Sequence, residues 1–405
     1  MAMQVKMEDV DRLSDLPDSI LSHILSFLST KEAVGTSVLS SKWRHLFTSV
    51  SNLDFDLEHE NLKSYTFGVN SFISFVDKML FSHNMTNIEN FRLKRNTRVD
   101  SNSVYRWISA AAVRGVKHLD LNIWLDKSIM FPGVVFTCRT LVTLKLDLCS
   151  FVFDVPKSVH LPNLKTLHLS RVEFSNDDSF KNLLSGCISL EDMVLRYWHG
   201  DTNFSITHHL LKRLTIFSCD LSYCKIMIDT PNLVYFRCCY PLVTVISKGI
   251  SLENMQSLVE ADINIYQYGV LQADAIPVFT GISNLRSLRL SSRSLKEFVS
   301  SLPENVPPCL SFKLKAVEVS GFTDDENCME MVKYILKNGG ALEKLTIRTS
   351  PSISGTKRMK IYQVLLSCPR KAEQCCVSIV CQPSCGCETG DDIHEDILLA
   401  MWKDY

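Results

Sequence analysis

The chain has 405 residues, of which 46% are hydrophobic and 21% charged, and its formal net charge is −1. This composition is typical of a folded chain with two or three domains or one long repeat array, and it argues against intrinsic disorder. The near-zero charge argues against a nucleic-acid-binding protein that relies on bulk positive charge. No apolar run reaches the roughly 18 residues of a membrane span, so we expect no membrane partner.

Fifteen cysteines are scattered along the chain, mostly inside apolar runs, as Cys149, Cys187 and Cys238 are. The N-terminus lacks the apolar core of a signal peptide. Free thiols that pack as small hydrophobes are therefore expected, which predicts a reducing compartment, the cytoplasm and/or the nucleus.

Residues 1–15 are polar and are predicted to be a mobile leader. Three short helices are predicted between Leu16 and Phe47. The first follows Leu16-Pro17 and carries an apolar stripe at helical spacing. Ser29 and Glu32 form a capping box for the second helix, and Ser40 is positioned to cap the third, SKWRHLF.

This helical module has too much apolar surface for its size, because about 40 residues rarely hold a core alone. A partner protein that covers the stripe is the simplest remedy. An ordinary helical cap on a larger domain would bury the same residues, so the pattern alone leaves both interpretations open.

The stretch LPDSILSHILSFLSTKEAV, followed by TSVLSSKWRHLF, closely resembles a plant F-box. In that family the module docks on a Skp-family adaptor, which joins it to a cullin-based ubiquitin ligase. The resemblance implies ten adaptor-binding residues: Leu16, Pro17, Ile20, Leu21, Ile24, Leu25, Val38, Leu39, Trp43 and Leu46.

After this module, the alternation of Leu53, Phe55 and Leu57 predicts a strand, and an apolar stripe over 72–80 predicts a helix. A unit of the form Leu-x-x-Leu-x-Leu then appears eleven times, from Ile88 to Ile347, at intervals of 21 to 29 residues. That period is typical of leucine-rich repeats, whose short parallel strands stack into a solenoid and share one core.

The segment PPCLSFKLKAVEVSGFTDDENCMEMVKYILKNGGALEKLTIRTS resembles the FBD domain that closes many plant F-box proteins with leucine-rich repeats. Its pattern predicts strand, helix, strand, helix and strand, with Thr323 and Glu326 as a capping box. We expect this region to cap the solenoid, because repeat arrays need their exposed end covered.

The predicted fold is therefore α/β: an N-terminal three-helix F-box, an irregular leucine-rich-repeat solenoid and an α+β FBD-like C-terminal cap. The predicted boundaries are 1–15 for the leader, 16–50 for the F-box, 51–302 for the solenoid, 303–381 for the cap and 382–405 for a polar tail.

The residues between the inward-pointing positions of each strand are expected to face outward on the concave side of the solenoid. Basic residues dominate the positions assigned to this face except around Glu260 and Asp262, which suggests that the face binds a target protein with an acidic segment. A solvated repeat face explains scattered charge equally well. The candidate target-binding residues are Lys145, Arg196, Arg213, Tyr235, Arg237 and Arg289.

No hydrolase, metalloprotease or phosphate-loop motif occurs in the sequence, and the cysteine spacing does not match a zinc module, so we expect no catalysis, metal or cofactor. The sequence predicts a non-catalytic substrate-recognition subunit of an SCF-type ubiquitin ligase. The alternatives are a ligand-dependent, hormone-type F-box receptor and an adaptor-binding scaffold that marks nothing for degradation.

Overall fold

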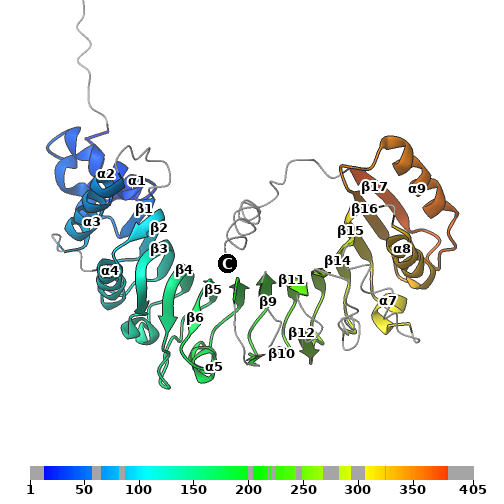
Figure 1. The fold of residues 1–405 in the computed structure, drawn as a ribbon. Coiled ribbons are helices and arrows are strands. Elements are labelled where there is room, and N and C mark those ends of the chain that lie inside the picture. Colours follow the sequence, from blue (N-terminus) through cyan, green and yellow to red (C-terminus); the bar gives the residue numbers. More distant parts are fainter. Residues whose placement is uncertain are drawn as a thin grey trace, which may run out of the picture. The chain divides into compact units, whose positions relative to one another are not determined.

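The computed structural model describes residues 13–56, 65–81, 87–198, 204–217, 219, 225–242, 249–267, 282–292, 306–323 and 325–381. The chain divides into two compact units, which are drawn in Figure 1. The N-terminal unit consists of residues 1–233 with 246–253, and the C-terminal unit consists of 234–245 with 254–405. Most of the predicted leader, Leu57 and the whole predicted tail lie outside the described residues.

The N-terminal unit begins with a helical module that has its own small core. Its elements are α1 (Asp18–Leu25), α2 (Thr30–Gly35) and the 3₁₀ helices η1 (Thr36–Val38) and η2 (Trp43–Ser49). Leu21, Leu25, Trp43 and Leu46 are among the buried residues of this core. The predicted capping box is confirmed: the Glu32 amide donates to the Ser29 hydroxyl (3.3 Å), and the Ser29 amide donates to the Glu32 carboxylate (3.0 Å).

The predicted cap of the third helix is wrong. This segment is the 3₁₀ helix η2, which starts at Trp43, and no side chain caps it. Tertiary contacts hold its start instead: the Trp43 indole Nε1 donates to the Ser14 hydroxyl (3.1 Å), and the Lys42 ammonium donates to the Leu16 carbonyl (2.7 Å). The burial of Trp43 therefore overrides the local preference of Ser40 for a cap position.

The strands of the N-terminal unit form one parallel sheet in which each pairs with the next. Its strands are β1 (Asn52–Asp56), β2 (Asn90–Val99), β3 (His118–Met130), β4 (Thr143–Phe153), β5 (Thr166–Ser170), β7 (Asp192–Arg196) and β9 (Arg213–Phe217). The short strand β6 (Glu173–Phe174) pairs with β4. A second parallel sheet contains β8 (Phe204–Thr207), β10 (Lys225–Asp229) and β12 (Gly249–Glu253).

The helices of this unit are α3 (Tyr65–Phe81), α4 (Ser101–Val113), η3 (Gly133–Thr137) and α5 (Asp177–Gly186). The predicted apolar stripe is confirmed in α3, where Phe72, Val76 and Leu80 are buried. A hydrogen bond from the Trp107 indole of α4 to the Asp77 carboxylate of α3 (2.7 Å) joins the two helices. Because Trp107 is fully buried, this bond satisfies a donor that water cannot reach.

The C-terminal unit repeats the same parallel pairing. Its strands are β11 (Tyr235–Leu242), β13 (Glu260–Gln267), β14 (Ser287–Ser291), β15 (Ala316–Phe322), β16 (Lys344–Thr349) and β17 (Cys376–Cys381). The helices whose bounds the described residues give here are α7 (Pro308–Phe312), α8 (Glu326–Asn338) and α9 (Gly355–Ser367). The predicted order of strand, helix, strand, helix and strand is confirmed in β15, α8, β16, α9 and β17.

The predicted capping box at the start of α8 is wrong. Asp325, not Thr323, is the N-cap, and its carboxylate accepts a hydrogen bond from the Asn327 amide (3.1 Å). A carboxylate immediately before the helix reaches the free amides more directly than a hydroxyl two residues earlier. The Thr323 hydroxyl is left without a hydrogen-bond partner.

The predicted repeats are confirmed in their burial. Every apolar position of the eleven Leu-x-x-Leu-x-Leu units is buried, and none is more than 3% exposed. Their central leucines also align across strands: Leu119 pairs with Leu144, and Leu144 with Leu167. The repeated apolar positions of the sequence therefore form a shared core that runs through the stacked strands of each unit.

Free cysteines form part of this core, as predicted. Cys187 and Cys238 are both buried and free of disulfides. Burial raises the pKa of the Cys187 thiol to about 12, so this side chain remains a neutral, small hydrophobe at physiological pH. Among the described helices, none is both long and apolar enough to cross a membrane.

Replacing two glycines of the N-terminal unit by alanine is expected to change the free energy of unfolding in opposite directions. A Cβ on Gly186, at the end of α5, would lie 2.7 Å from the Val159 carbonyl oxygen and closer still to the Val159 side chain. A Cβ on Gly35, in α2, would meet no atom within 4 Å. We expect Gly186→Ala to lower the free energy of unfolding by about 1–3 kcal/mol, as overpacking does.

Gly35→Ala is the matched control, and we expect it to raise the free energy of unfolding by roughly 0.5–1 kcal/mol because alanine is the better helix former. Urea denaturation of both variants measures the two effects. A neutral Gly186→Ala variant would contradict the packing described around Val159.

Candidate functional site

The helical module carries an exposed apolar face, defined here as Pro17, Ile20, Ile24, Phe27, Val38 and Leu39. Val38 is 85% exposed, Phe27 75% and Leu39 65%. These values are high for large apolar side chains, and the residues come from one small module. An exposed apolar patch of this kind marks a surface for protein binding.

The ten predicted adaptor-binding residues fall into two groups. Leu21, Leu25, Trp43 and Leu46 are at most 7% exposed and form the module's own core, and Leu16 is partly buried against it. Pro17, Ile20, Ile24, Val38 and Leu39 belong to the exposed apolar face. A partner can reach the second group directly, whereas the first group supports that face from behind.

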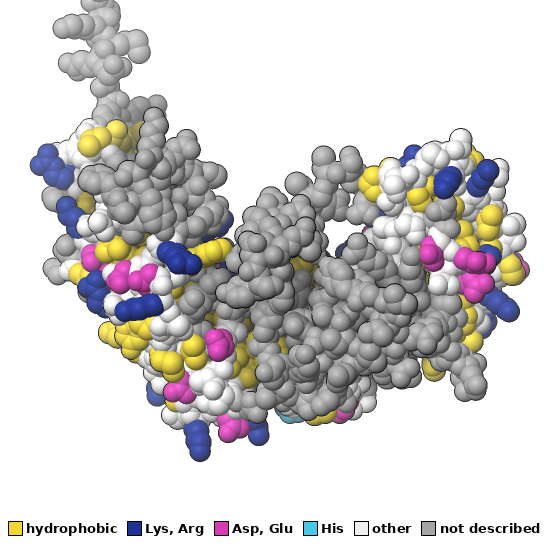
Figure 2. All heavy atoms as spheres, viewed as in Figure 1, with side chains coloured by type: hydrophobic (Ala, Val, Ile, Leu, Met, Phe, Trp, Pro, Cys, Tyr) yellow, Lys and Arg dark blue, Asp and Glu magenta, His cyan; other side chains and the backbone are white. Residues whose placement is uncertain are grey.

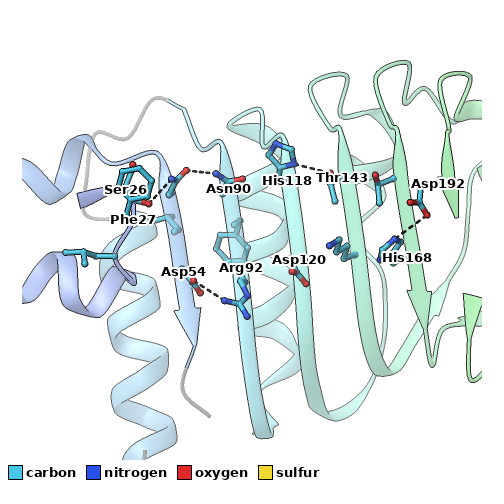
Figure 3. A pocket seen from close by; sticks show the side chains of 16 residues that line it. Ser26, Phe27, Asp54, Asn90, Arg92, His118, Asp120, Thr143, His168 and Asp192 are labelled. Atoms are coloured by element: carbon cyan, nitrogen blue, oxygen red, sulfur yellow. Dashed lines mark hydrogen bonds and ion pairs between the residues drawn. The ribbon is translucent and has the colours of Figure 1, made fainter. Parts of the chain in front are cut away.

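The second candidate surface is the open face of the N-terminal unit's sheet, where the residues between the buried positions point. The strand pairing places Asp54, Arg92, Asp120, Lys145 and His168 in one row across β1 to β5. Figure 3 shows Asp54, Arg92, Asp120 and His168 on the near side of the sheet, with a helix behind it. We call these five residues the charged row.

The first four residues of the charged row alternate in sign. The Asp54 carboxylate accepts a hydrogen bond from the Arg92 guanidinium on the next strand (3.2 Å). A neighbouring row contains Asp192, whose carboxylate accepts two hydrogen bonds from Arg213 (2.7 and 2.9 Å). Figure 2 likewise shows acidic and basic side chains interspersed over the described surface of this unit.

The open face of the C-terminal unit has the same character. Its pairing places Arg237, Asp262, Arg289 and Glu318 in one row across β11 to β15. Arg237 forms an ion pair with Asp262 (3.5 Å), and Glu318 accepts a hydrogen bond from the Arg348 guanidinium (2.6 Å). Both faces are therefore charge-balanced, and the expectation of a predominantly basic face needs correction.

The six predicted target-binding residues are divided between the units. Lys145, Arg196 and Arg213 lie in the N-terminal unit, and Tyr235, Arg237 and Arg289 lie in the C-terminal unit. The Arg196 guanidinium stacks 5.7 Å from the centre of the Phe217 ring, and Arg213 is bound to Asp192. Lys145 alone of the six lines the pocket described next.

A pocket of about 580 Å³ opens on this face of the N-terminal unit. One wall comes from residues 26–28, which follow α1, and the floor comes from β1 to β5 and from β7. Figure 3 shows Ser26 and Phe27 beside the strands. Its floor includes the whole charged row together with His118 and Asp192. The pocket thus lies where the helical module meets the repeats.

Burial and neighbouring charges shift the pKa values of two carboxyl groups in this pocket, one downward and one upward. The pKa of Asp192 is lowered by His168, whose Nε2 lies 3.7 Å away, and by Arg213. Burial raises the pKa of Asp120, although Lys145 and Arg92 counteract this effect. At Asp192 the basic partners therefore outweigh the cost of burying the charged carboxylate, whereas at Asp120 the cost of burial is larger than the effect of the basic neighbours.

The sequence predictions missed the acidic residues of this site and the exposed Phe27. Asp54 and Asp120 stand between two buried apolar residues, at the position that Lys145 occupies in its own repeat. That equivalence was readable from the sequence. No group of three potential metal-ligating side chains occurs among the residues that the structure describes.

Comparison with protein families agrees with this layout. An F-box domain model matches residues 13–55, and an FBD model matches residues 302–347. A model described as "FBD-associated F-box protein At5g56370, LRR repeats" matches residues 104–258.

Several Arabidopsis thaliana proteins are similar over most of the chain. Putative F-box/FBD/LRR-repeat protein At3g59240 is 35% identical over 84% of this chain and 70% of its own length. The chain belongs to the F-box/FBD/LRR-repeat family. F-box/LRR-repeat protein At4g14103 is 37% identical over 71% of this chain and 79% of its own length. F-box/LRR-repeat protein At3g58900 is 38% identical over 72% of this chain and 94% of its own length.

Membership in the F-box/FBD/LRR-repeat family gives the two surfaces a context. An F-box domain implies binding of a Skp-family adaptor, and the exposed apolar face lies within the matched residues 13–55. Proteins of this family are typically non-catalytic adaptors.

The lowered pKa of Asp192 predicts how stability depends on pH. A carboxyl group with a lower pKa in the folded state stabilises the fold above its unfolded pKa of about 3.9, and this contribution is lost as the pH falls through the folded value. Asp192→Asn removes it. We therefore expect the free energy of unfolding of the wild type to exceed that of the variant at pH 6, and the difference to shrink below about pH 4.

Denaturant unfolding at several pH values measures this difference. Asp178→Asn is the control, because Asp178 is exposed and has no ion pair among the described residues. A difference between wild type and Asp192→Asn that is independent of pH would contradict the assigned interactions.

Proposed function

We propose that this chain is the substrate-recognition subunit of an SCF-type ubiquitin ligase. Its helical module binds a Skp-family adaptor, which links it to a cullin, and the open face of its sheets binds the target protein. The chain performs no bond chemistry in this role. It holds a target lysine near a charged conjugating enzyme, so its contribution is proximity.

The exposed apolar face carries this proposal. The module already has a complete core of its own around Leu21, Leu25 and Trp43. The exposed surface of Ile20, Ile24 and Val38 lies outside that core, and each large apolar side chain that a partner fully covers is worth roughly 1.5–3 kcal/mol. A surface with this composition on an F-box domain fits an adaptor.

The buried free thiols support a location in the cytoplasm or the nucleus, where cysteines stay reduced. A ligand-dependent receptor is the second candidate function, since the 580 Å³ pocket has a size typical of small-molecule sites.

Adaptor binding tests the proposal. We expect Leu39→Asp to weaken the binding of a purified Skp-family adaptor at least about tenfold, because it places a charge in an apolar interface. Leu39 is 65% exposed, so we expect the melting temperature of the variant to stay close to that of the wild type. Isothermal titration calorimetry and thermal melting measure the two quantities.

Two further variants complete this experiment. Val113→Asp is the matched control, because Val113 is 75% exposed on α4 and lies outside the helical module. We expect it to bind the adaptor normally. Trp43→Ala should instead unfold the module, at a cost of about 3–5 kcal/mol. A wild-type chain that does not bind the adaptor would overturn the proposed function.

A further inference from the structure

The pocket on the open face has a polar chemistry that adaptor binding does not use. In the row across its floor, the Asp54 carboxylate binds Arg92 through Oδ2, whereas its Oδ1 is buried and has no hydrogen-bond partner. Asp120 forms no hydrogen bond or ion pair with any other described residue, and burial raises its pKa. The pocket floor thus offers acceptors that a bound cation could use.

The same floor also offers a donor. Lys145 pairs in register with Asp120 on the adjacent strand, and it has no ion pair with any residue that the structure describes. Adjacent strands lie about 4.8 Å apart. The Asp120 carboxylate and the Lys145 ammonium therefore stand on adjacent strands and attract each other, but neither forms a hydrogen bond or an ion pair with a described residue.

The total charge of the site limits what it can bind. Asp54, Asp120 and Asp192 are offset by Arg92 and Lys145, which also line the pocket, and by Arg213, which holds Asp192 from outside. A ligand that carries only negative charge, such as a polyphosphate or an acidic peptide, would gain no net attraction. A ligand with one positive and one negative group would match both unsatisfied partners.

The shape of the site favours a polypeptide over a small molecule. A second hollow of about 180 Å³ continues along the same face and shares Asp120, Lys145 and His168 with the pocket. It extends to Asp147 and Arg196. The first pocket is lined from β1 to β5 and from β7, so the binding surface is elongated across the strands, as an extended peptide requires.

We propose that this pocket binds an extended segment of the target protein that carries a basic and an acidic side chain two residues apart. The basic side chain binds Asp120 and the acidic one binds Lys145. Same-side neighbours in an extended peptide are roughly 6.6–6.8 Å apart, and the rotatable bonds of long side chains cover the difference from the strand spacing. Leu28, at the pocket wall, offers apolar surface for the stem of the basic side chain.

This inference rests on the proposed function and names the chemistry of its target. The probe is a set of acetylated and amidated pentapeptides in which Arg or Lys is separated by one alanine from Glu or Asp. Asp120→Asn and Lys145→Gln change the pocket while keeping the size of each side chain similar. Calorimetry measures the affinity of the full chain for each peptide, and thermal melting checks that each variant is folded.

A double-mutant cycle gives the decisive result. We expect Asp120→Asn to weaken binding of the Arg/Glu peptide at least about tenfold but to leave the affinity for a Gln/Glu peptide unchanged. Lys145→Gln should show the same coupling to the peptide's Glu. The control is the double variant Glu89→Gln/Lys117→Gln, which removes an exposed ion pair (2.5 Å) outside the pocket lining and should leave peptide binding unchanged.

Three results would overturn the inference: no binding by any peptide of the set, binding that neither pocket variant changes, or equal binding of free amino acids. The last would identify a small zwitterionic ligand and favour the ligand-dependent receptor. Both pocket variants should keep full affinity for the Skp-family adaptor. If the wild-type chain binds the adaptor but none of the peptides, only this inference is contradicted, whereas a wild-type chain that does not bind the adaptor contradicts the proposed function.

Discussion

The structure depends on one constraint: stacked parallel strands must bury the same two positions of each repeat. In-register neighbours such as Leu119, Leu144 and Leu167 share one core, and each fully buried large side chain contributes roughly 1.5–3 kcal/mol. A shift of one residue would expose this set to water, so the register is strongly specified. The same register places the intervening residues in rows on the open face. The packing of the core behind the sheet therefore determines which charged residues are neighbours in the charged row.

In the helical module, by contrast, the core does not bury all of the apolar side chains. Its core is complete with a few residues, and the width of the apolar stripe on α1 exceeds what that core can cover. The surplus side chains stay in water in the isolated chain, which is unfavourable until a partner covers them. Folding and partner binding thus use different faces of one short helix. The two faces can be separated by mutation because Leu21 and Leu25 are buried whereas Ile20 and Ile24 are exposed.

The repeats, the strand and helix order of the FBD-like region and the Ser29 capping box were predictable because each rests on local spacing. Helices α4 and α5 and the sheet of β8, β10 and β12 were not predicted, since they lie between repeat units and carry no repeat of their own. The cap at Ser40 failed because the buried Trp43 decides where η2 begins. The inward-facing residues of α1, Leu21 and Leu25, pack in the same core as this tryptophan. The acidic residues of the open face could have been placed from their position in the repeat, whereas the pairing of Arg213 with Asp192 required the cross-strand register.

The central claim is that the exposed apolar face, and not the sheet, binds the adaptor. Hydrogen–deuterium exchange of the full chain, with and without a purified Skp-family adaptor, tests it directly. The account predicts slower exchange in peptides that cover 17–28 and 36–40, and unchanged exchange in the strands β3, β4 and β5. Unchanged exchange in the helical module, or protection confined to the strands, would contradict the account.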